Sequence, residues 1–121
     1  MVPVDLGITT SQSDDYTVVA VSGEVDIYSA PQLDAVLSEL IAAGQVALVV
    51  DLTEVGFLDS TGLGVLVKAL KRCREANGSV AVVTQGERVL RVFSITGLDA
   101  VIPVHPTLAA ALEPAGGDGF D

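Results

Sequence analysis

The alternation of apolar and polar residues predicts that the chain begins with two strands. Leu6 to Thr10 and Tyr16 to Ser22 have the pattern of strands, and the polar segment between them, SQSDD, has the composition of a turn. Strands joined by a short turn pair in opposite directions. We therefore expect an antiparallel pair at the start of the domain.

A helical period follows the second strand. The segment SGEVD is expected to be a loop, and Ser29 with Pro31 close behind it marks the start of a helix. Gly44 is expected to end this helix. Between these signals, apolar residues recur three and four positions apart, which places them on one helix face: Leu33, Val36, Leu37, Leu40 and Ile41.

Strands and helices alternate over the rest of the chain. Val46 to Leu52 is nearly all apolar and predicts a central strand, and the segment TEVGFLD after it is expected to be a loop. Leu63 to Leu70 shows a second apolar helix face, and Asn77 with Gly78 is expected to stop that helix. The remaining expected elements are a strand at Ala100–Val104, a strand at Val80–Val83, a helix at Glu87–Thr96 and a short helix at Thr107–Leu112.

This order of elements predicts an α/β fold. An antiparallel strand pair followed by alternating helices and strands indicates a mixed, mostly parallel sheet of about five strands with about four helices. Residues 1–112 are expected to form one domain, and residues 113–121 (EPAGGDGFD) have the composition of a flexible C-terminal tail. Functional loops of such sheets lie at the carboxyl ends of the strands, which is where the TEVGFLDST segment is expected.

Charge narrows the kinds of partner. The net charge is -10, all six basic residues lie between Lys68 and Arg91, and residues 1–67 contain acids but no base. Such a surface repels nucleic acid and anionic membranes and suits a partner with a basic patch, although solubility alone also accounts for it. The sequence has neither an apolar run of about 20 residues nor a signal peptide pattern, and it has a single cysteine. We therefore expect a cytoplasmic protein without a membrane span.

The segment FLDSTGLGVL, Phe57 to Leu66, carries the candidate chemistry. Asp59 or Ser60 is able to cap the following helix through a side-chain oxygen. Gly62 and Gly64 cost up to about 1 kcal/mol each in a helix relative to Ala, so their presence suggests that small side chains leave the backbone and the hydroxyls open to a partner. On that interpretation Gly62→Val impairs binding more than folding. A helix start is also a favourable place for a phosphate.

FLDSTGLGVL closely resembles the signature of anti-sigma factor antagonists, the single-domain proteins of the STAS family. The segment VSGEVDIYSAPQL, Val21 to Leu33, resembles the strand, acidic loop and first helix of that family. VFSITGLDAVIPV, Val92 to Val104, resembles its third helix, Gly-Leu turn and last strand. The resemblance runs from about Leu6 to Leu112 and implies a STAS-type sheet.

The resemblance also implies a partner switch. In the family, the unmodified antagonist binds an anti-sigma factor that is itself a serine kinase, and this frees a sigma factor. Phosphorylation by the kinase, here at Ser60 with Thr61 as a secondary candidate, ends the binding, and a PP2C-type phosphatase restores it. The implied partner-binding residues are Glu24, Asp26, Asp59, Ser60, Thr61, Gly62 and Leu63. The chain would be a ligand and substrate rather than an enzyme, would need no cofactor or metal, and would be a monomer or weak dimer.

Other functions are less well supported. A receiver domain using Asp51 would need further acids after the first strand and a lysine after the last, and no lysine follows Lys71. A hydrolase using Ser60 would depend on the sole histidine, His105, and lacks the GxSxG elbow. A STAS module of a transporter or a stress-signalling assembly stays open as the main alternative. Cys73 is interpreted as a buried packing thiol, with redox sensing as the alternative.

Overall fold

The computed structural model describes residues 6–113, which form a five-stranded sheet in the order β1-β2-β3-β4-β5. β1 and β2 are antiparallel, whereas β2, β3, β4 and β5 are parallel. The strands are β1 (Gly7–Ser13), β2 (Tyr16–Val25), β3 (Ala47–Leu58), β4 (Ser79–Val83) and β5 (Val104–His105). The predicted mixed sheet with an antiparallel start is confirmed.

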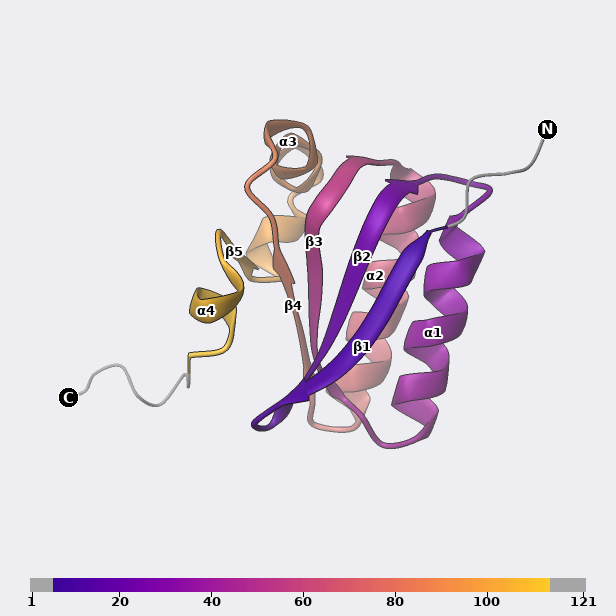
Figure 1. Cartoon of the computed structure of the whole chain (residues 1–121), viewed down its shortest axis with the longest axis vertical. Helices are drawn as coiled ribbons and strands as arrows, with labels where there is room; N and C mark the ends of the chain where they lie inside the picture. Colours follow the sequence, from indigo (N-terminus) through magenta and orange to yellow (C-terminus); the bar gives the residue numbers. More distant parts are fainter. Residues whose placement is uncertain (1–5, 114–121) are drawn as a thin grey trace.

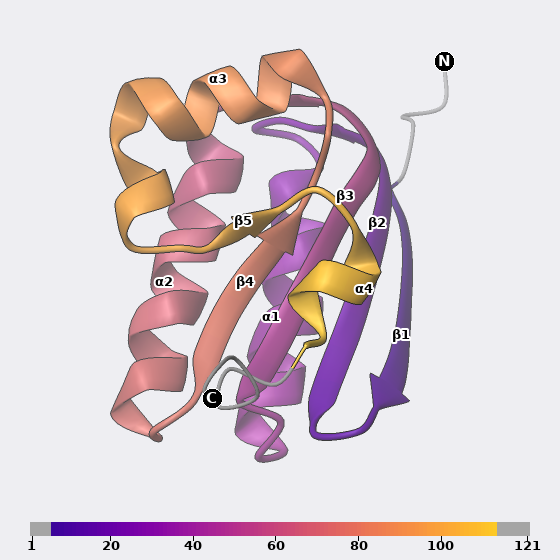
Figure 2. The same ribbon diagram turned by 90° about the vertical axis from the view of Figure 1, so that its left-hand side faces the viewer.

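Four α-helices and one 3-10 turn surround this sheet. They are α1 (Ala30–Ala42), α2 (Ser60–Glu75), α3 (Glu87–Thr96), the 3-10 turn η1 (Leu98–Ala100) and α4 (Leu108–Ala111). α1 and α2 cover one face of the sheet, and α4 lies on the other (Figures 1 and 2). α3 crosses the end of the sheet where β4 finishes (Figure 2).

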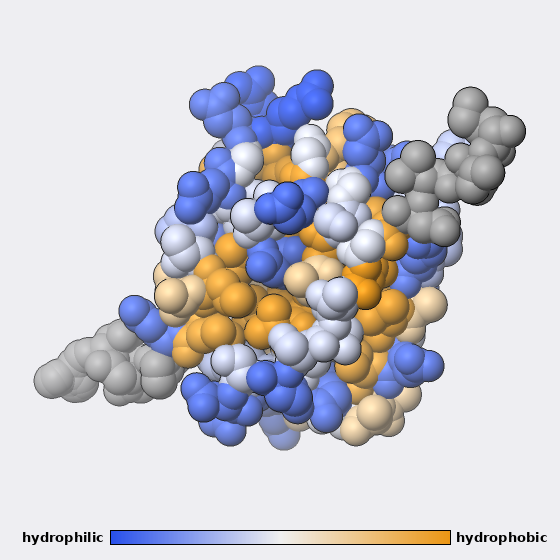
Figure 3. Space-filling model, viewed as in Figure 1, coloured by the Kyte–Doolittle hydropathy of each residue, from blue (hydrophilic) through white to orange (hydrophobic). Residues whose placement is uncertain are grey.

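The main core lies between the sheet and α1, α2 and α3. It is built from Val, Leu and Ala with one large aromatic residue, Phe93, which is fully buried. The second face has a smaller cluster, in which Val18, Val49 and Val83 pack against Ala111 of α4. On the face drawn in Figure 3, apolar residues gather across the middle, and hydrophilic residues gather above and below them.

The segments SGEV and TEVGFL, which were predicted as loops, are parts of strands. β2 continues through SGEV to Val25, and β3 continues through TEVGFL to Leu58, because these segments pair with each other up to Val25 and Leu58. The register shifts twice along this pairing, after Ala20 and after Gly23. Those irregularities break the period-2 alternation, so the sequence pattern resembles a loop although the backbone is paired.

The first hairpin and the last strand also differ from the prediction. β1 extends into SQSDD as far as Ser13, and Asp14, with a φ of 53°, makes the turn. The strand predicted at Ala100–Val104 is shorter and later, at Val104–His105, because Gly97 adopts a left-handed φ of 77° that turns the chain from α3 into η1. Pairing with β4 then begins at the Pro103 carbonyl, which accepts from the Val82 N–H.

Cys73 is buried in the main core, as predicted, and burial raises the pKa of its thiol above the ordinary value. The reactive form of a cysteine is the thiolate, so both access and ionisation are suppressed. We expect iodoacetamide at pH 8 to leave Cys73 of the native protein unmodified and to alkylate it promptly in guanidinium chloride, as followed by mass spectrometry. Labelling of the native protein at the rate of an exposed thiol would instead support redox sensing.

Candidate functional site at the start of α2

Ser60 is the first residue of α2, and its side chain is exposed. Within residues 6–113 its hydroxyl makes no hydrogen bond, so it neither caps the helix nor bonds to a neighbouring side chain. Thr61 follows it and is half-buried. Ser60 is therefore the more accessible of the two predicted hydroxyls.

Asp59, and not Ser60, caps the helix. Its carboxylate Oδ1 accepts from the backbone N–H groups of Thr61 and Gly62, at 2.9 and 3.2 Å. Its own N–H donates to the Val25 carbonyl at 3.1 Å, which ties the start of α2 to the end of β2. Of the two capping side chains that the sequence left open, the structure selects Asp59.

Gly62 and Leu63 are buried, so Gly62 is not the open position that was expected from the sequence. Gly62 is buried, and a Cβ there would overlap Leu58 Cδ1 and lie 2.7 Å from Val25 Cγ1. Its role in the structure is to let α2 approach the ends of β2 and β3, so the expectation that it leaves backbone open is wrong. Leu63 is 6% exposed and belongs to the main core. Gly64, which is exposed with nothing within 4 Å of a Cβ, is the open glycine of the motif.

The Glu24 and Asp26 segment lies beside the motif because Glu24 is opposite Phe57, and Val25 is opposite Leu58, in the β2–β3 register. Glu24 is exposed, whereas Asp26 is half-buried and bonded within its own loop. The Asp26 carboxylate accepts from the N–H groups of Tyr28 and Ser29, and the Ser29 contact is the main reason that the pKa of Asp26 is lowered. Asp26 therefore stays charged and fixed.

α1 begins at Ala30, directly after Ser29, as the sequence predicted, but the Ser29 side chain does not cap the helix. Its hydroxyl instead donates to the Glu24 carbonyl at 2.6 Å and accepts from the Asp26 N–H at 3.0 Å. Ser29 is 4% exposed, so this contact joins the end of β2 to the start of α1 inside the protein.

Apolar residues exposed around the motif were not found by sequence reasoning. Ile27 is 63% and Tyr28 86% exposed in the β2–α1 loop, and Phe57 is 40% exposed at the end of β3. A groove of about 340 Å³ runs from Phe57 and Leu58 to α3, where Arg88 and Arg91 line it. The segment VDIY gives no periodic signal, because exposure in a loop depends on which neighbours cover it.

The model of the STAS domain family matches residues 7–111, which is most of the chain and includes every residue of the site. The chain belongs to the STAS family.

Relatives of this STAS domain include anti-sigma factor antagonists. It is 36% identical over 102 residues to the anti-sigma-B factor antagonist of Staphylococcus epidermidis, covering 84% of this chain and 94% of that protein. The crystal structure of an anti-sigma factor antagonist from Mycobacterium paratuberculosis has a TM-score of 0.82 at 36% identity, covering 88% and 91% of the two chains. SpoIIAA of Bacillus in its phosphorylated form is 20% identical with a TM-score of 0.68, covering 87% and 96%, which concerns the fold.

The alternative sites have little support in this STAS domain. Asp51 is not at the end of a strand, as the receiver interpretation required, because β3 continues for seven residues to Leu58. Its carboxylate accepts from the N–H and the hydroxyl of Thr53. Residues 6–113 contain no group of three His, Cys, Asp or Glu side chains able to hold a metal ion, and none of their helices is long and apolar enough to span a membrane.

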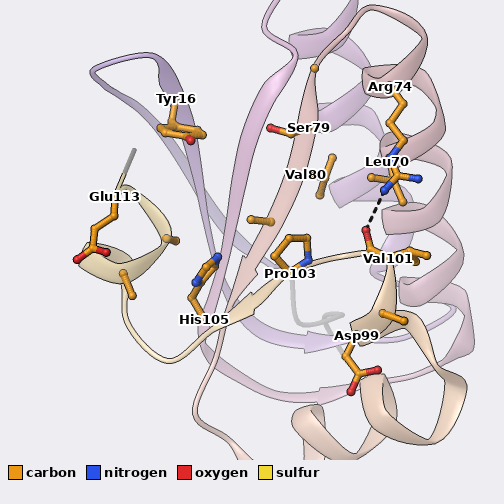
Figure 4. A pocket seen from close by; sticks show the side chains of 15 residues that line it. Tyr16, Leu70, Arg74, Ser79, Val80, Asp99, Val101, Pro103, His105 and Glu113 are labelled. Carbon is orange, nitrogen blue, oxygen red and sulfur yellow. Dashed lines mark hydrogen bonds between the residues drawn. The ribbon is translucent and has the colours of Figure 1, made fainter. Parts of the chain in front are cut away.

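A cavity of about 840 Å³ is formed elsewhere in the fold. It lies along the edge of β4, between α2, η1 and α4 (Figure 4). Arg74 crosses it to donate to the Val101 carbonyl, and His105 contributes to its wall. None of the predicted site residues lines this cavity.

Proposed function

We propose that this STAS domain is the antagonist of a partner switch, which binds a serine-kinase anti-sigma factor to release a sigma factor and is turned off by phosphorylation at Ser60. The observation that carries the proposal is the Ser60 hydroxyl, exposed at the start of α2 with no hydrogen bond to residues 6–113. A kinase has to reach the hydroxyl and align it with a phosphate, and a hydroxyl used as a helix cap would be unavailable for that. Asp59 supplies the cap instead.

The electrostatics of the site explain how a phosphate would end binding. A phosphoserine adds a charge of about -1.5 to -2 at neutral pH. The Thr61 and Gly62 amides, which would otherwise help to neutralise an anion at this helix start, already bond to Asp59. Glu24 and Asp26 are carried on the neighbouring strand end, and no base occurs between residues 6 and 67. The added charge therefore finds no counter-charge among residues 6–67 and is repelled by the carboxylates of Glu24, Asp26 and Asp59.

The rest of the proposal concerns the partners. The kinase-type anti-sigma factor meets the acidic site with a basic surface, and a PP2C-type phosphatase removes the phosphate. The chain catalyses nothing itself and works in the cytoplasm as a monomer or weak dimer. The aligned segment accounts for 94% of the Staphylococcus antagonist, so the similarity extends over nearly the whole of that protein.

Reconstitution with purified proteins tests this function. Each serine-kinase anti-sigma factor encoded in the source genome is mixed with this chain and Mg-ATP. We expect one of them to bind the unmodified chain, to release its sigma factor, and to add one phosphate that tandem mass spectrometry places on Ser60. Thr61→Ala should still gain the phosphate and Ser60→Ala should not. A phosphate on Thr61 alone, or no kinase that binds, would contradict the proposal.

A further inference from the structure

The β2–α1 loop exposes two apolar side chains next to the proposed phosphorylation site. Ile27 is 63% and Tyr28 86% exposed, so neither contributes much to the core. Single exposed apolar residues are common on protein surfaces and need no explanation by themselves. Two adjacent ones on a short, fixed loop beside a functional motif are a different case.

Hydrogen bonds hold this loop at both ends. The Asp26 carboxylate accepts from the Tyr28 N–H at 2.9 Å and from the Ser29 N–H at 3.0 Å. The Asp26 carbonyl accepts from the Ala30 N–H at 2.8 Å, which joins the loop to the first residue of α1. The loop is therefore preformed, and a preformed contact loses less conformational entropy on binding than a flexible one.

The Ile27–Tyr28 loop starts beside the FLDSTGLGVL motif. Val25, the residue before Asp26, accepts the Asp59 N–H through its carbonyl, and Asp59 directly precedes Ser60. β2 ends at Val25 and continues into the Ile27–Tyr28 loop. β3 ends at Leu58, opposite Val25, and continues into α2 (Figure 1). A protein that covers Ser60 closely is thus able to reach Tyr28 without a second, separate contact area.

We infer that Ile27 and Tyr28 are the apolar anchor of the antagonist interface, and that they insert into an apolar pocket with basic groups at its rim on the anti-sigma factor. This rests on the proposed function. The charged residues of segments 24–28 and 57–63, which are Glu24, Asp26 and Asp59, are all acidic, so a basic rim complements them. Tyrosine is one of the residues that most often dominate binding energy in interfaces, when it fills a desolvated pocket.

Alanine substitutions test the anchor by isothermal titration against the kinase that binds the wild type. We expect Tyr28→Ala to weaken binding about 30-fold or more, which is the threshold of an interface hot spot, and Ile27→Ala to weaken it about tenfold. Ile95→Ala is the matched control, because Ile95 is 76% exposed but lies on α3. It should change affinity less than twofold. Equal melting temperatures would show that all three variants are folded.

A fluorescence reporter tests insertion directly. The chain contains no tryptophan, so Tyr28→Trp gives it a single indole at the anchor. We expect the emission of Tyr28→Trp, after subtraction of the wild-type complex, to move to shorter wavelength when the kinase binds. Ile95→Trp, which places the indole at an exposed position of α3, should show no such shift in emission wavelength.

The outcomes separate this inference from the proposed function. If Ser60→Glu abolishes binding while Tyr28→Ala binds like wild type, the anchor is wrong and the switch stands. If Ile95→Ala weakens binding as much as Tyr28→Ala, or if the indole at position 28 stays in water in the complex, the anchor is also wrong. If no serine-kinase anti-sigma factor binds the wild-type chain, the proposed function and the anchor both fail.

Discussion

Ser60→Glu is expected to bind the anti-sigma kinase more than a hundredfold more weakly than the wild-type chain. A charge placed in a close interface without a counter-charge costs on the order of 3 kcal/mol or more. Each 1.4 kcal/mol, roughly, is a factor of ten in affinity. Ser60→Asp should behave similarly, and the phosphorylated chain should bind more weakly still because it carries more charge and bulk.

Because Asp59 caps α2, acidic substitutions at Ser60 change charge without removing the helix cap. Asp59 accepts the Thr61 and Gly62 amides, so Ser60→Ala removes an exposed hydroxyl and no helix-capping bond. We expect Ser60→Ala to keep the wild-type melting temperature and to bind the kinase within a few-fold of wild type. It therefore serves as the matched control for the acidic variants.

Isothermal titration of the four forms, Ser, Ala, Glu and phospho-Ser at position 60, measures the effect. Equal affinities for all four would remove Ser60 from the mechanism. Equal losses for Ala and Glu would mean that the hydroxyl itself, rather than the absence of charge, supports binding.

Gly62→Val should destabilise the fold by about 3 kcal/mol, at the upper end of the usual range for overpacking a core. The added Cβ meets Leu58 on one side and lies 2.7 Å from Val25 Cγ1 on the other. Both of these residues end central strands and are buried, so they have little room to move. For a domain of this size, the melting temperature should fall by roughly 10 °C.

Gly64→Val is the control for that substitution. Gly64 lies in the same helix, is exposed, and has nothing within 4 Å of a Cβ. Valine is a somewhat better helix former than glycine, so this variant should be as stable as wild type or slightly more stable. If thermal denaturation gave the same small effect for both valine variants, the packing of α2 against the ends of β2 and β3 would differ from that described.

The local pattern of the sequence was enough to predict the order of the elements and the fold class. The apolar faces of α1 and α2 and the core strands Val46–Leu52 and Val80–Val83 follow from residue spacing alone, because neighbours along one element decide which side is buried. Leu33, Leu37, Leu66 and Leu70 are buried as that spacing requires. The FLDSTGLGVL motif also identified the family, which the match over residues 7–111 confirms.

The extent of β2 and β3 was decided by tertiary structure. SGEV and TEVGFL are strands only because each pairs with the other across two register shifts. Neither segment carries the alternation that would reveal this by itself. Bulges of this kind are set by the partner strand, so a pattern within one strand does not predict them.

The roles within the motif were decided in the same way. The residue pattern alone shows that an acid, two hydroxyls and two glycines stand where a strand becomes a helix. Only the fold chose Asp59 over Ser60 as the cap, buried Gly62 against Val25 and Leu58, and left Gly64 open. The exposure of Ile27 and Tyr28 was equally invisible, because the sequence pattern does not show which side chains a neighbouring element covers. The physical reason is common to all of these: propensity and period act within one segment, whereas burial and hydrogen-bond choice at a strand end depend on residues tens of positions away in the chain.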